Sequence, residues 1–403
     1  MPGRPPLRRC CAIYLEPVEA VSFDVAALLA GRDPRQRALA WSALAPHLDA
    51  PVAVDEDEVV ALGRIGPSEW IEAEAASRLA PEDVLRRLVA KNLLLEQGRS
   101  ARADQRDLAL REAKWHPLLA TAHAFSRWSN VDSLQAQEAS GIRSTADMIR
   151  SAGLPPPHFH ARRDAGERLP LASPSANPLD RLLQRRATCR NFDRDAALPL
   201  SELSRILHRT FGEQGREEIE PGAVAVKKNH PSGGGLHPLE AYVVARRVDG
   251  VEPGLYHYNV EAHALDRLPR PDGFDAGEFA RHAVAGQHYF SDAAVLVVVA
   301  ARFPRATWKY PKHPKIYRAI LLEAGHASQN LYLSATDAGL GAFITAAINE
   351  VEIEQALGLD ALFEGPIAVC GFGPRARTRE TVELDPQARV WGSNGERIDG
   401  ERD

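Results

Sequence analysis

The chain has 403 residues, of which 44% are apolar and 26% charged, and its formal net charge is −5. This length allows about two to three domains, and the composition is that of a globular protein with a sizeable core. Basic and acidic residues alternate without forming a basic face, so we expect no nucleic-acid partner. The longest apolar run, Ala293 to Ala301, is too short to span a bilayer, so we predict a buried strand there and no membrane partner.

The cysteines are Cys10, Cys11, Cys189 and Cys370, and none forms a C-x-x-C pair. Neighbouring cysteines bridge each other only with strain, so the pattern predicts reduced thiols and a cytoplasmic protein. Glu16 and Glu19 interrupt any apolar signal core near the N-terminus.

Residues 1–150 are predicted to form a mostly helical N-terminal domain, with one short strand candidate at Cys11–Leu15. Its clearest pattern is Pro81–Gly98, in which Pro81 suits a first helical turn and Asn92 can end the helix in a left-handed conformation. The apolar residues Leu93–Glu96 then indicate a strand. This succession is typical of a winged-helix module, which can bind DNA or hold a peptide along a strand edge; another small α/β module stays open as an alternative.

We expect the helix around Trp115–Trp128 to pack this domain onto the C-terminal one. Residues 151–178 are rich in proline and lack periodicity, which predicts a linker. His158 and His160 lie there without the Cys, Asp or Glu spacing of a metal site. We therefore interpret them as surface residues and predict no metal.

Residues 179–385 alternate between helical and strand patterns, which predicts an α+β sheet domain with helices packed on it, followed by a polar tail over 386–403. Ser201 is the expected cap of one helix, and Asn349 with Glu352 is the expected capping pair of another. The predicted helices are Pro178–Arg186, Ser201–Phe211, Glu278–Ala285 and Glu350–Leu357, and the predicted strands are Glu240–Val248, Leu255–Tyr258, Ala264–Leu268, Ala293–Ala301 and Pro366–Phe372.

A longer helix is predicted from Tyr317 towards Gly341, with apolar residues round most of its surface. We expect it to be buried nearly all round. Its remaining polar stripe needs partners, which a subunit interface or a bound cofactor could supply. That stripe consists of Glu323, His326, Asn330, Ser334 and Asp337.

Four separated stretches could build one site for an anion and a flat ring. Arg185–Phe192 (RRATCRNF) supplies arginines for a phosphate. Pro231–Pro238 (PSGGGLHP) exposes glycine backbone, which suits a phosphate, a ring lying on it, or a plain turn before the next strand. Gly339–Ala342 (GLGA) and Gly371–Arg375 (GFGPR) follow the long helix and the last strand.

In this order the motifs resemble the nitroreductase-like flavoprotein superfamily, and closely its SagB-type peptide dehydrogenase branch, over about residues 178–378. The resemblance is carried by PSGGGLHPLEAYVV, by YRAILLEAGHASQNLYLSATDAGLGA and by the terminal GFGPR. It implies a homodimer that binds FMN at the subunit interface. It also implies a winged-helix-like N-terminal module that engages a ribosomally made precursor peptide or a cyclodehydratase.

Carried over to this chain, the resemblance assigns the cofactor contacts. The phosphate would be held by Arg185 or Arg186, because Ala187 is inserted into the usual motif and leaves the choice open. The other implied FMN residues are Thr188, Arg190 and Arg375 at the phosphate, Pro231, Ser232, Gly233, Gly235 and His237 along the ring, and the backbone of Gly339, Leu340 and Gly341.

The SagB-type branch oxidises thiazoline or oxazoline rings in peptides to thiazoles or oxazoles, which removes a proton from one carbon and a hydride from its neighbour to flavin N5. Lys309 and Tyr310 resemble the Lys-Tyr pair of this branch, with Lys315 and Tyr317 as competitors. Since tyrosine and lysine both titrate near pH 10, a base among them needs a lowered pKa, and a neighbouring ammonium favours a phenolate.

Two other functions remain open. One is an NAD(P)H-dependent nitro- or quinone reductase that uses the same flavin site. The other is a non-catalytic scaffold that keeps the fold and holds a peptide for a partner enzyme.

Overall fold

The computed structural model describes residues 4–159, 162, 164, 166–172, 175 and 177–398. His160, one of the two linker histidines, lies outside these residues. The chain divides into two compact units. The first joins the residues up to Arg127 with Phe303–Arg318 and Ala361–Phe363, and the second joins Trp128–Arg302, Ala319–Asp360 and the residues from Glu364 on.

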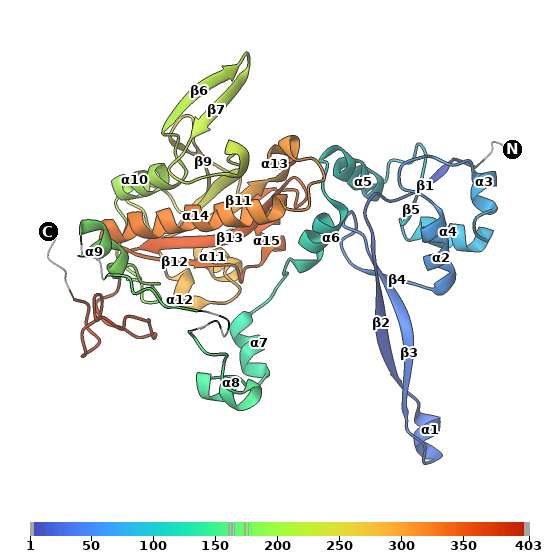
Figure 1. Ribbon diagram of the computed structural model, residues 1–403, viewed down its shortest axis with the longest axis horizontal. Helices are drawn as coiled ribbons and strands as arrows, with labels where there is room; N and C mark the ends of the chain where they lie inside the picture. Colours follow the sequence, from blue (N-terminus) through green and yellow to red (C-terminus); the bar gives the residue numbers. More distant parts are fainter. Residues whose placement is uncertain are drawn as a thin grey trace. The chain divides into compact units, whose positions relative to one another are not determined.

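The second unit is built on a six-stranded antiparallel sheet in the order β10-β9-β8-β11-β13-β12 (Figure 1). Its central strand β11 is apolar and buried from Val295 to Ala301, as the sequence predicted. The strands are β8 (Leu239–Ala245), β9 (Gly254–Asn259), β10 (Ala264–Arg267), β11 (Val295–Arg302), β12 (Gly341–Thr345) and β13 (Glu364–Gly373).

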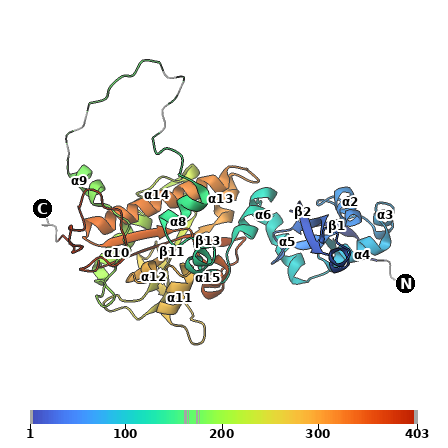
Figure 2. The same ribbon diagram turned by 90° about the horizontal axis from the view of Figure 1, so that it is seen from below.

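Helices cover both faces of this sheet, with α14 on one side and α11 and α15 on the other (Figure 2). Phe290 stacks on Phe343 with ring centroids 4.1 Å apart in the core under α11 and α15. The helices of this part of the chain are α7 (Ser133–Ala139), α8 (Thr145–Ala152), α9 (Pro178–Arg185), α10 (Leu200–Phe211), α11 (Ala276–Ala283), α12 (His288–Ser291), α14 (Ile316–Asp337, whose first residues belong to the first unit) and α15 (Glu350–Leu357).

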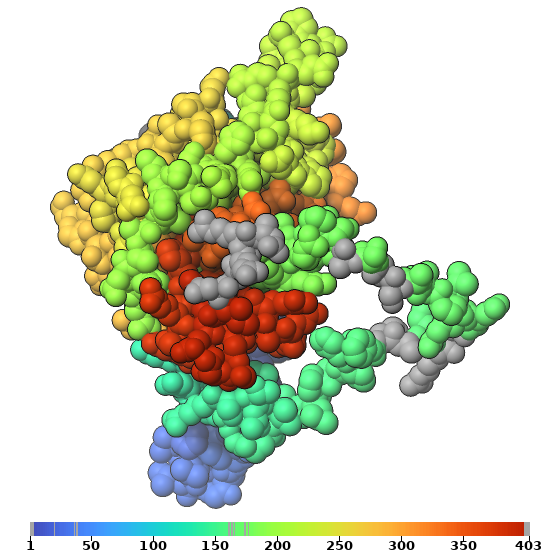
Figure 3. Space-filling view, turned by 90° about the vertical axis from the view of Figure 1, so that its left-hand side faces the viewer, coloured from blue at the N-terminus to red at the C-terminus, as the bar shows by residue number. Residues whose placement is uncertain are grey.

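A hairpin of β6 (Gly215–Glu220) and β7 (Ala223–Lys227) stands out from the second unit (Figures 1 and 3). The sequence did not predict it, because acidic residues fill β6 and no face of it is buried. In the space-filling view the C-terminal segment, in red, lies on the surface of the same unit (Figure 3). Val390 and Trp391 of this segment are nevertheless buried, and they pack on Ala187.

The first unit contains the predicted helix, stop and strand. α4 spans Glu82–Ala90, Asn92 is left-handed with φ 57°, and β5 (Leu94–Glu96) pairs with β1 (Leu7–Arg9). These local predictions are confirmed. The remaining helices are α1 (Val25–Leu29), α2 (Glu56–Arg64), α3 (Ala73–Ser77), α5 (Arg102–Glu112), α6 (Pro117–Ser126) and α13 (Phe303–Lys309).

The single short strand expected near Cys11–Leu15 was wrong in extent. The ten-residue strands β2 (Tyr14–Phe23) and β3 (Arg35–Leu44) form a long hairpin, and β4 (Val52–Val54) pairs with β3. Pro17 lies within β2, and β3 is rich in alanine and leucine, which favour helices. Pairing between the two strands outweighs these local preferences.

Two capping predictions were also wrong. α10 begins after Pro199 and has no side-chain cap from Ser201. The Asn349 side chain does not cap α15; its Oδ1 accepts from Val131 N at 2.9 Å and its Nδ2 donates to Val131 O at 3.0 Å. A fully buried amide is thus satisfied by matching both backbone groups of one residue.

Cys10, Cys11, Cys189 and Cys370, all among the described residues, are free thiols, as predicted. Burial raises the pKa of Cys10, Cys189 and Cys370 to about 12, so these thiols stay protonated at neutral pH and are inert. Within the part of the chain that the structure describes, no helix is long and apolar enough to cross a membrane.

An aromatic cluster holds the separated segments of the first unit together. Trp115 Nε1 donates to Leu362 O at 2.8 Å, and His123 Nε2 donates to Ala361 O at 2.9 Å. Because that nitrogen carries the proton, His123 Nδ1 accepts from the Tyr317 hydroxyl at 3.1 Å. Burial lowers the pKa of His123 from 6.5 to about 4, so the ring is neutral.

This histidine predicts an acid-sensitive stability. Between pH 6.5 and 4 the unfolded chain binds a proton that the folded chain does not, so stability falls as the pH is lowered, by roughly 2 kcal/mol at pH 5. We expect His123→Gln to lose less stability than the wild type between pH 7 and pH 5 in urea unfolding of the full chain. An equal loss in both proteins would contradict this assignment.

Candidate functional site

The glycine loop Gly233–Gly235 forms a single 3-10 turn before β8. Gly234 and Gly235 have φ of 72° and 69°, a conformation that favours glycine. A Cβ on Gly233 would lie 3.2 Å from the Cβ of Ala319 on α14, while all three glycines are exposed to solvent. The loop therefore lies against the long helix and leaves open backbone that a flat ligand can contact.

Ser232 ties this loop to α14. Its hydroxyl donates to Glu323 Oε2 at 2.5 Å and accepts from the backbone N–H of His237 at 2.8 Å. His237 is left-handed with φ 46°, and its side chain is buried rather than turned to the open side of the loop. Desolvation lowers the pKa of the neighbouring His230, which favours its neutral form.

The arginine segment lies beside a later part of the same helix. Thr188 Oγ1 is 3.0 Å from the Tyr332 hydroxyl, and the Arg186 guanidinium lies 5.3 Å from the centre of the Tyr332 ring. The backbone N–H of Cys189 donates to Ala342 O at 2.8 Å. Arg186 is thus half-buried near the predicted anion site, whereas Arg185 is exposed on α9.

Gly341 lies where this segment and the start of β12 touch. A Cβ there would lie 2.5 Å from Cys189 Sγ and 3.0 Å from Arg375 Cγ, so no larger residue fits without movement. Gly339, with φ 72°, ends α14, and Leu340 N donates back to Ala335 O at 2.8 Å. The predicted contact of this backbone with FMN stays a prediction.

Arg375 lies under the arginine segment with only 7% of its surface exposed. Its guanidinium donates to Glu383 Oε2 at 2.9 Å and to Ala187 O at 3.1 Å. Glu383 also accepts from Asn191 N at 3.0 Å and from Trp391 Nε1 at 2.7 Å. Arg375 therefore fixes the backbone of the segment, and a direct phosphate contact from it stays a prediction.

Sequence reasoning missed Glu383. It falls just before the stretch that composition indicated to be a polar tail. Trp391, a large aromatic in that tail, is the one signal that could have suggested a buried partner for it.

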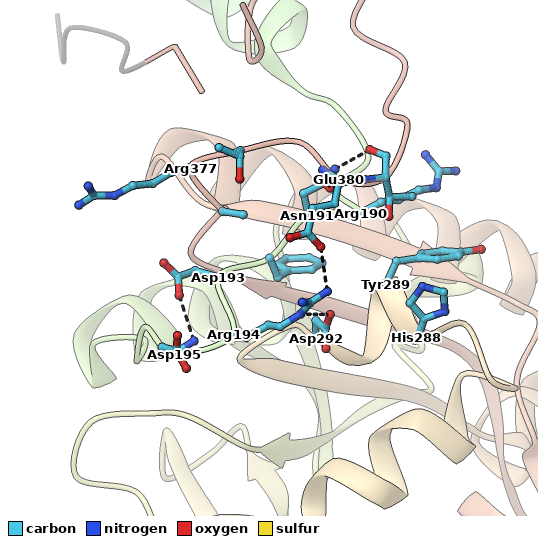
Figure 4. A pocket seen from close by; sticks show the side chains of 14 residues that line it. Arg190, Asn191, Asp193, Arg194, Asp195, His288, Tyr289, Asp292, Arg377 and Glu380 are labelled. Atoms are coloured by element: carbon cyan, nitrogen blue, oxygen red, sulfur yellow. Dashed lines mark hydrogen bonds and ion pairs between the residues drawn. The ribbon is translucent and has the colours of Figure 1, made fainter. Parts of the chain in front are cut away.

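Arg190 lines a polar cavity of about 270 Å³ (Figure 4). Its guanidinium lies 5.8 Å from the ring centres of Tyr289 and Phe290. Arg194 on the same wall is paired with Asp292 at 2.9 Å and with Glu380 at 3.2 Å, as Figure 4 shows. The cavity walls carry both signs of charge, and its lining includes the arginine segment but not the glycine loop.

The predicted cofactor residues therefore gather in two patches on one helix. The glycine loop meets α14 at Ala319 and Glu323, and the arginine segment meets it at Tyr332. Tyr332 follows Glu323 by nine residues, about 13.5 Å along the helix axis. Nine residues are also about two and a half helical turns, so the two patches meet opposite sides of α14.

Lys309 and Tyr310 belong to the first unit, whereas both patches belong to the second. Lys309 Nζ lies 5.8 Å from the centre of the Tyr310 ring, so the ammonium and the phenol are neighbours. The competitor Tyr317 differs, because its hydroxyl is hydrogen-bonded to the buried His123.

Comparison with known proteins identifies the family of the chain. The nitroreductase family matches residues 183–374. A protein of Methanocaldococcus jannaschii named as a nitroreductase, MJ1384, is 32% identical over 179 residues, which cover 44% of this chain and 83% of that protein. The chain belongs to the nitroreductase family.

Two further relatives are named for the processing of toxins. The trifolitoxin-processing protein TfxB of Rhizobium leguminosarum is 31% identical over 144 residues, which are 36% of this chain and 38% of TfxB. The microcin B17-processing protein McbC of Escherichia coli is 25% identical over 193 residues, which are 45% of this chain and 65% of McbC. The chain thus matches less than two thirds of either of these two proteins.

Among solved structures, the Escherichia coli microcin synthetase McbBCD complex with truncated pro-MccB17 covers 66% of this chain and 94% of its own, with a TM-score of 0.49 and 19% identity. A protein described as a nitroreductase from Ralstonia eutropha covers 52% of this chain and 88% of its own, with a TM-score of 0.39 and 26% identity.

The buried Arg375–Glu383 pair predicts the response to Glu383→Gln. That change leaves a buried guanidinium with an uncompensated charge, so we expect a loss of roughly 3 kcal/mol in urea unfolding. Glu380→Gln removes an exposed partner of Arg194 and should cost less than about 1 kcal/mol. Similar losses of unfolding free energy in both variants would show that the buried pair contributes no more to stability than the exposed one.

Proposed function

We propose that the protein is an FMN-dependent dehydrogenase of peptide maturation that oxidises thiazoline or oxazoline rings to thiazoles or oxazoles. The observation that carries this proposal is the exposed glycine backbone beside Ala319 of α14, together with Arg186 and Thr188 beside Tyr332 of the same helix. The likeness to proteins named for trifolitoxin and microcin B17 processing supports a peptide as the substrate.

The residues of the two patches fit FMN. Arg186, Thr188 and Arg190 would hold the phosphate, since two guanidinium groups and a hydroxyl lie on one short segment. The backbone of Gly233 and Gly235 would lie along the flavin ring, because these residues have no Cβ to keep the ring away from the backbone. When bound, FMN supplies a hydride acceptor for the ring carbon that is oxidised.

The proton of the neighbouring carbon needs a base, and we assign this role to Tyr310. The ammonium of Lys309, 5.8 Å from the centre of the Tyr310 ring, would be the cationic neighbour of this base. Lys315, exposed in the same loop, is the remaining competitor for the cationic role.

We propose in addition that the protein acts as a homodimer. The single chain does not bury α14 all round: Leu321 is 45% and Leu322 64% exposed, while Glu323 of the polar stripe is buried. A second copy that covers this apolar stretch would remove it from water. It would also bring further residues to the open side of the glycine loop, as an FMN site shared between subunits requires.

The N-terminal unit is the proposed contact for the precursor peptide or a cyclodehydratase. Its short β1–β5 pair offers a strand edge of the kind that binds extended peptides.

The likeness to MJ1384 favours the second candidate, an NAD(P)H-dependent nitro- or quinone reductase. Fast reduction of nitro compounds with no action on azoline peptides would decide for that reductase.

Replacing Tyr310 tests the proposed base. We expect Tyr310→Phe and Lys309→Ala to slow azole formation by at least about a hundredfold, because each removes part of the proton-abstracting pair. Their flavin absorbance should stay at the wild-type level. The measurement is the mass loss of an azoline-containing peptide, followed over time.

Lys312→Ala, an exposed lysine of the same loop, is the matched control and should keep the wild-type rate. Unchanged turnover in both Tyr310→Phe and Lys309→Ala would remove the catalytic assignment. A purified protein that stays colourless even after FMN is added would contradict both enzymatic functions.

Replacing Leu322 tests the dimer. We expect Leu322→Arg to give monomers in analytical ultracentrifugation and to retain less FMN, since a buried guanidinium in an apolar interface is costly. Leu200→Arg changes a leucine of α10 that is 45% exposed and should leave both properties unchanged. A monomeric wild-type protein with full flavin content would contradict the shared site.

A further inference from the structure

A cluster of three titratable side chains lies between the glycine loop and α14. His230, His237 and Glu323 are 3%, 9% and 2% exposed, and one possible ligand atom from each lies within 4.8 Å of the others. Each also has a buried polar atom without a hydrogen-bond partner among the described residues, namely His230 Nε2, His237 Nδ1 and Glu323 Oε1. Buried polar atoms of this kind are costly unless a ligand satisfies them.

The distances suit metal ligands better than hydrogen bonds. Glu323 Oε1 lies 3.5 Å from His237 Nδ1. His230 Nδ1 lies 3.9 Å from the same oxygen but is 3.4 Å from Pro231 O, so His230 Nε2 is the nitrogen without a partner. Hydrogen bonds between nitrogen and oxygen are about 2.7–3.2 Å long. With metal–ligand bonds of about 2.0–2.1 Å, tetrahedral ligand atoms are roughly 3.4 Å apart.

The surroundings orient these side chains. The Ser232 hydroxyl occupies Glu323 Oε2, which leaves Oε1 to face the two imidazoles. The same hydroxyl accepts from His237 N, so carboxylate and histidine are held by one group. His237 is kept in a left-handed conformation with φ 46°, which is strained for a residue with a side chain and needs support from its surroundings. Support of this kind around the ligands is common in metal sites.

We propose that His230, His237 and Glu323 bind one divalent transition-metal ion of the Zn²⁺ class. Two imidazoles and one carboxylate are the ligands of several zinc sites, and they leave a coordination position open. The ion compensates the buried carboxylate and joins the loop before β8 to α14. This site is separate from the proposed oxidation chemistry, because it needs no flavin to form.

The test uses the full-length protein, stripped with a chelator and dialysed against Zn²⁺. Elemental analysis should give about one zinc per chain, and titration calorimetry should give a matching stoichiometry. We expect His230→Ala, His237→Ala and Glu323→Gln each to weaken Zn²⁺ binding by about tenfold or more. His326→Ala, an exposed histidine one turn further along α14, is the matched control and should bind as the wild type does.

A ligand variant could also fail to fold, so circular dichroism of the metal-free proteins accompanies the titration. Zn²⁺ should raise the melting temperature of the wild type and of His326→Ala but not that of a folded Glu323→Gln. Less than about a tenth of a zinc per chain in the wild type, or equal binding by all variants, overturns the site. A wild-type protein that binds zinc but does not bind added FMN would overturn the flavin proposal alone.

Discussion

The buried pairing of Arg375 with Glu383 is the interaction on which the arrangement of the second unit depends. It joins the end of β13, the C-terminal segment and the backbone of the arginine segment through Ala187. Asn191 and Trp391 complete the hydrogen bonds of the same carboxylate. A buried charge that loses one of its partners is strongly destabilising. The packing of these segments against one another is therefore cooperative.

The long helix α14 is the element that both the glycine loop and the arginine segment contact. Ala319 and Glu323 meet the glycine loop and Tyr332 meets the arginine segment, so one helix fixes the separation of these two segments along its axis. A straight helix is suited to this task because its rise per residue hardly varies.

The sequence predicts best those parts whose burial follows a simple rule. β11 and β13 could be predicted as continuous apolar runs in a covered sheet, and α14 from its helical periodicity. The glycine loop and the arginine segment could be found because glycine and arginine chemistry at such spacing is uncommon. Both segments contact α14, whereas their union in one binding site and the roles of single residues stay predictions.

The features that the sequence did not indicate depend on distant partners. The β2–β3 hairpin forms against the local preferences of its residues, and Asn349 turns to Val131 instead of capping its own helix. Glu383 looks like an ordinary tail residue until Arg375 and Trp391 surround it. Tertiary contacts of this kind override local propensity, which no window of sequence can reveal.

The first unit is discontinuous along the chain, and this has a consequence for how the protein can change. Thr307 Oγ1 donates to Ala113 O at 2.7 Å and Lys312 N donates to Lys114 O at 2.8 Å, on either side of Lys309 and Tyr310. The N-terminal part is therefore not a domain that could be exchanged independently of the later segments of the chain. Any replacement of it would also have to rebuild the loop that carries Lys309 and Tyr310.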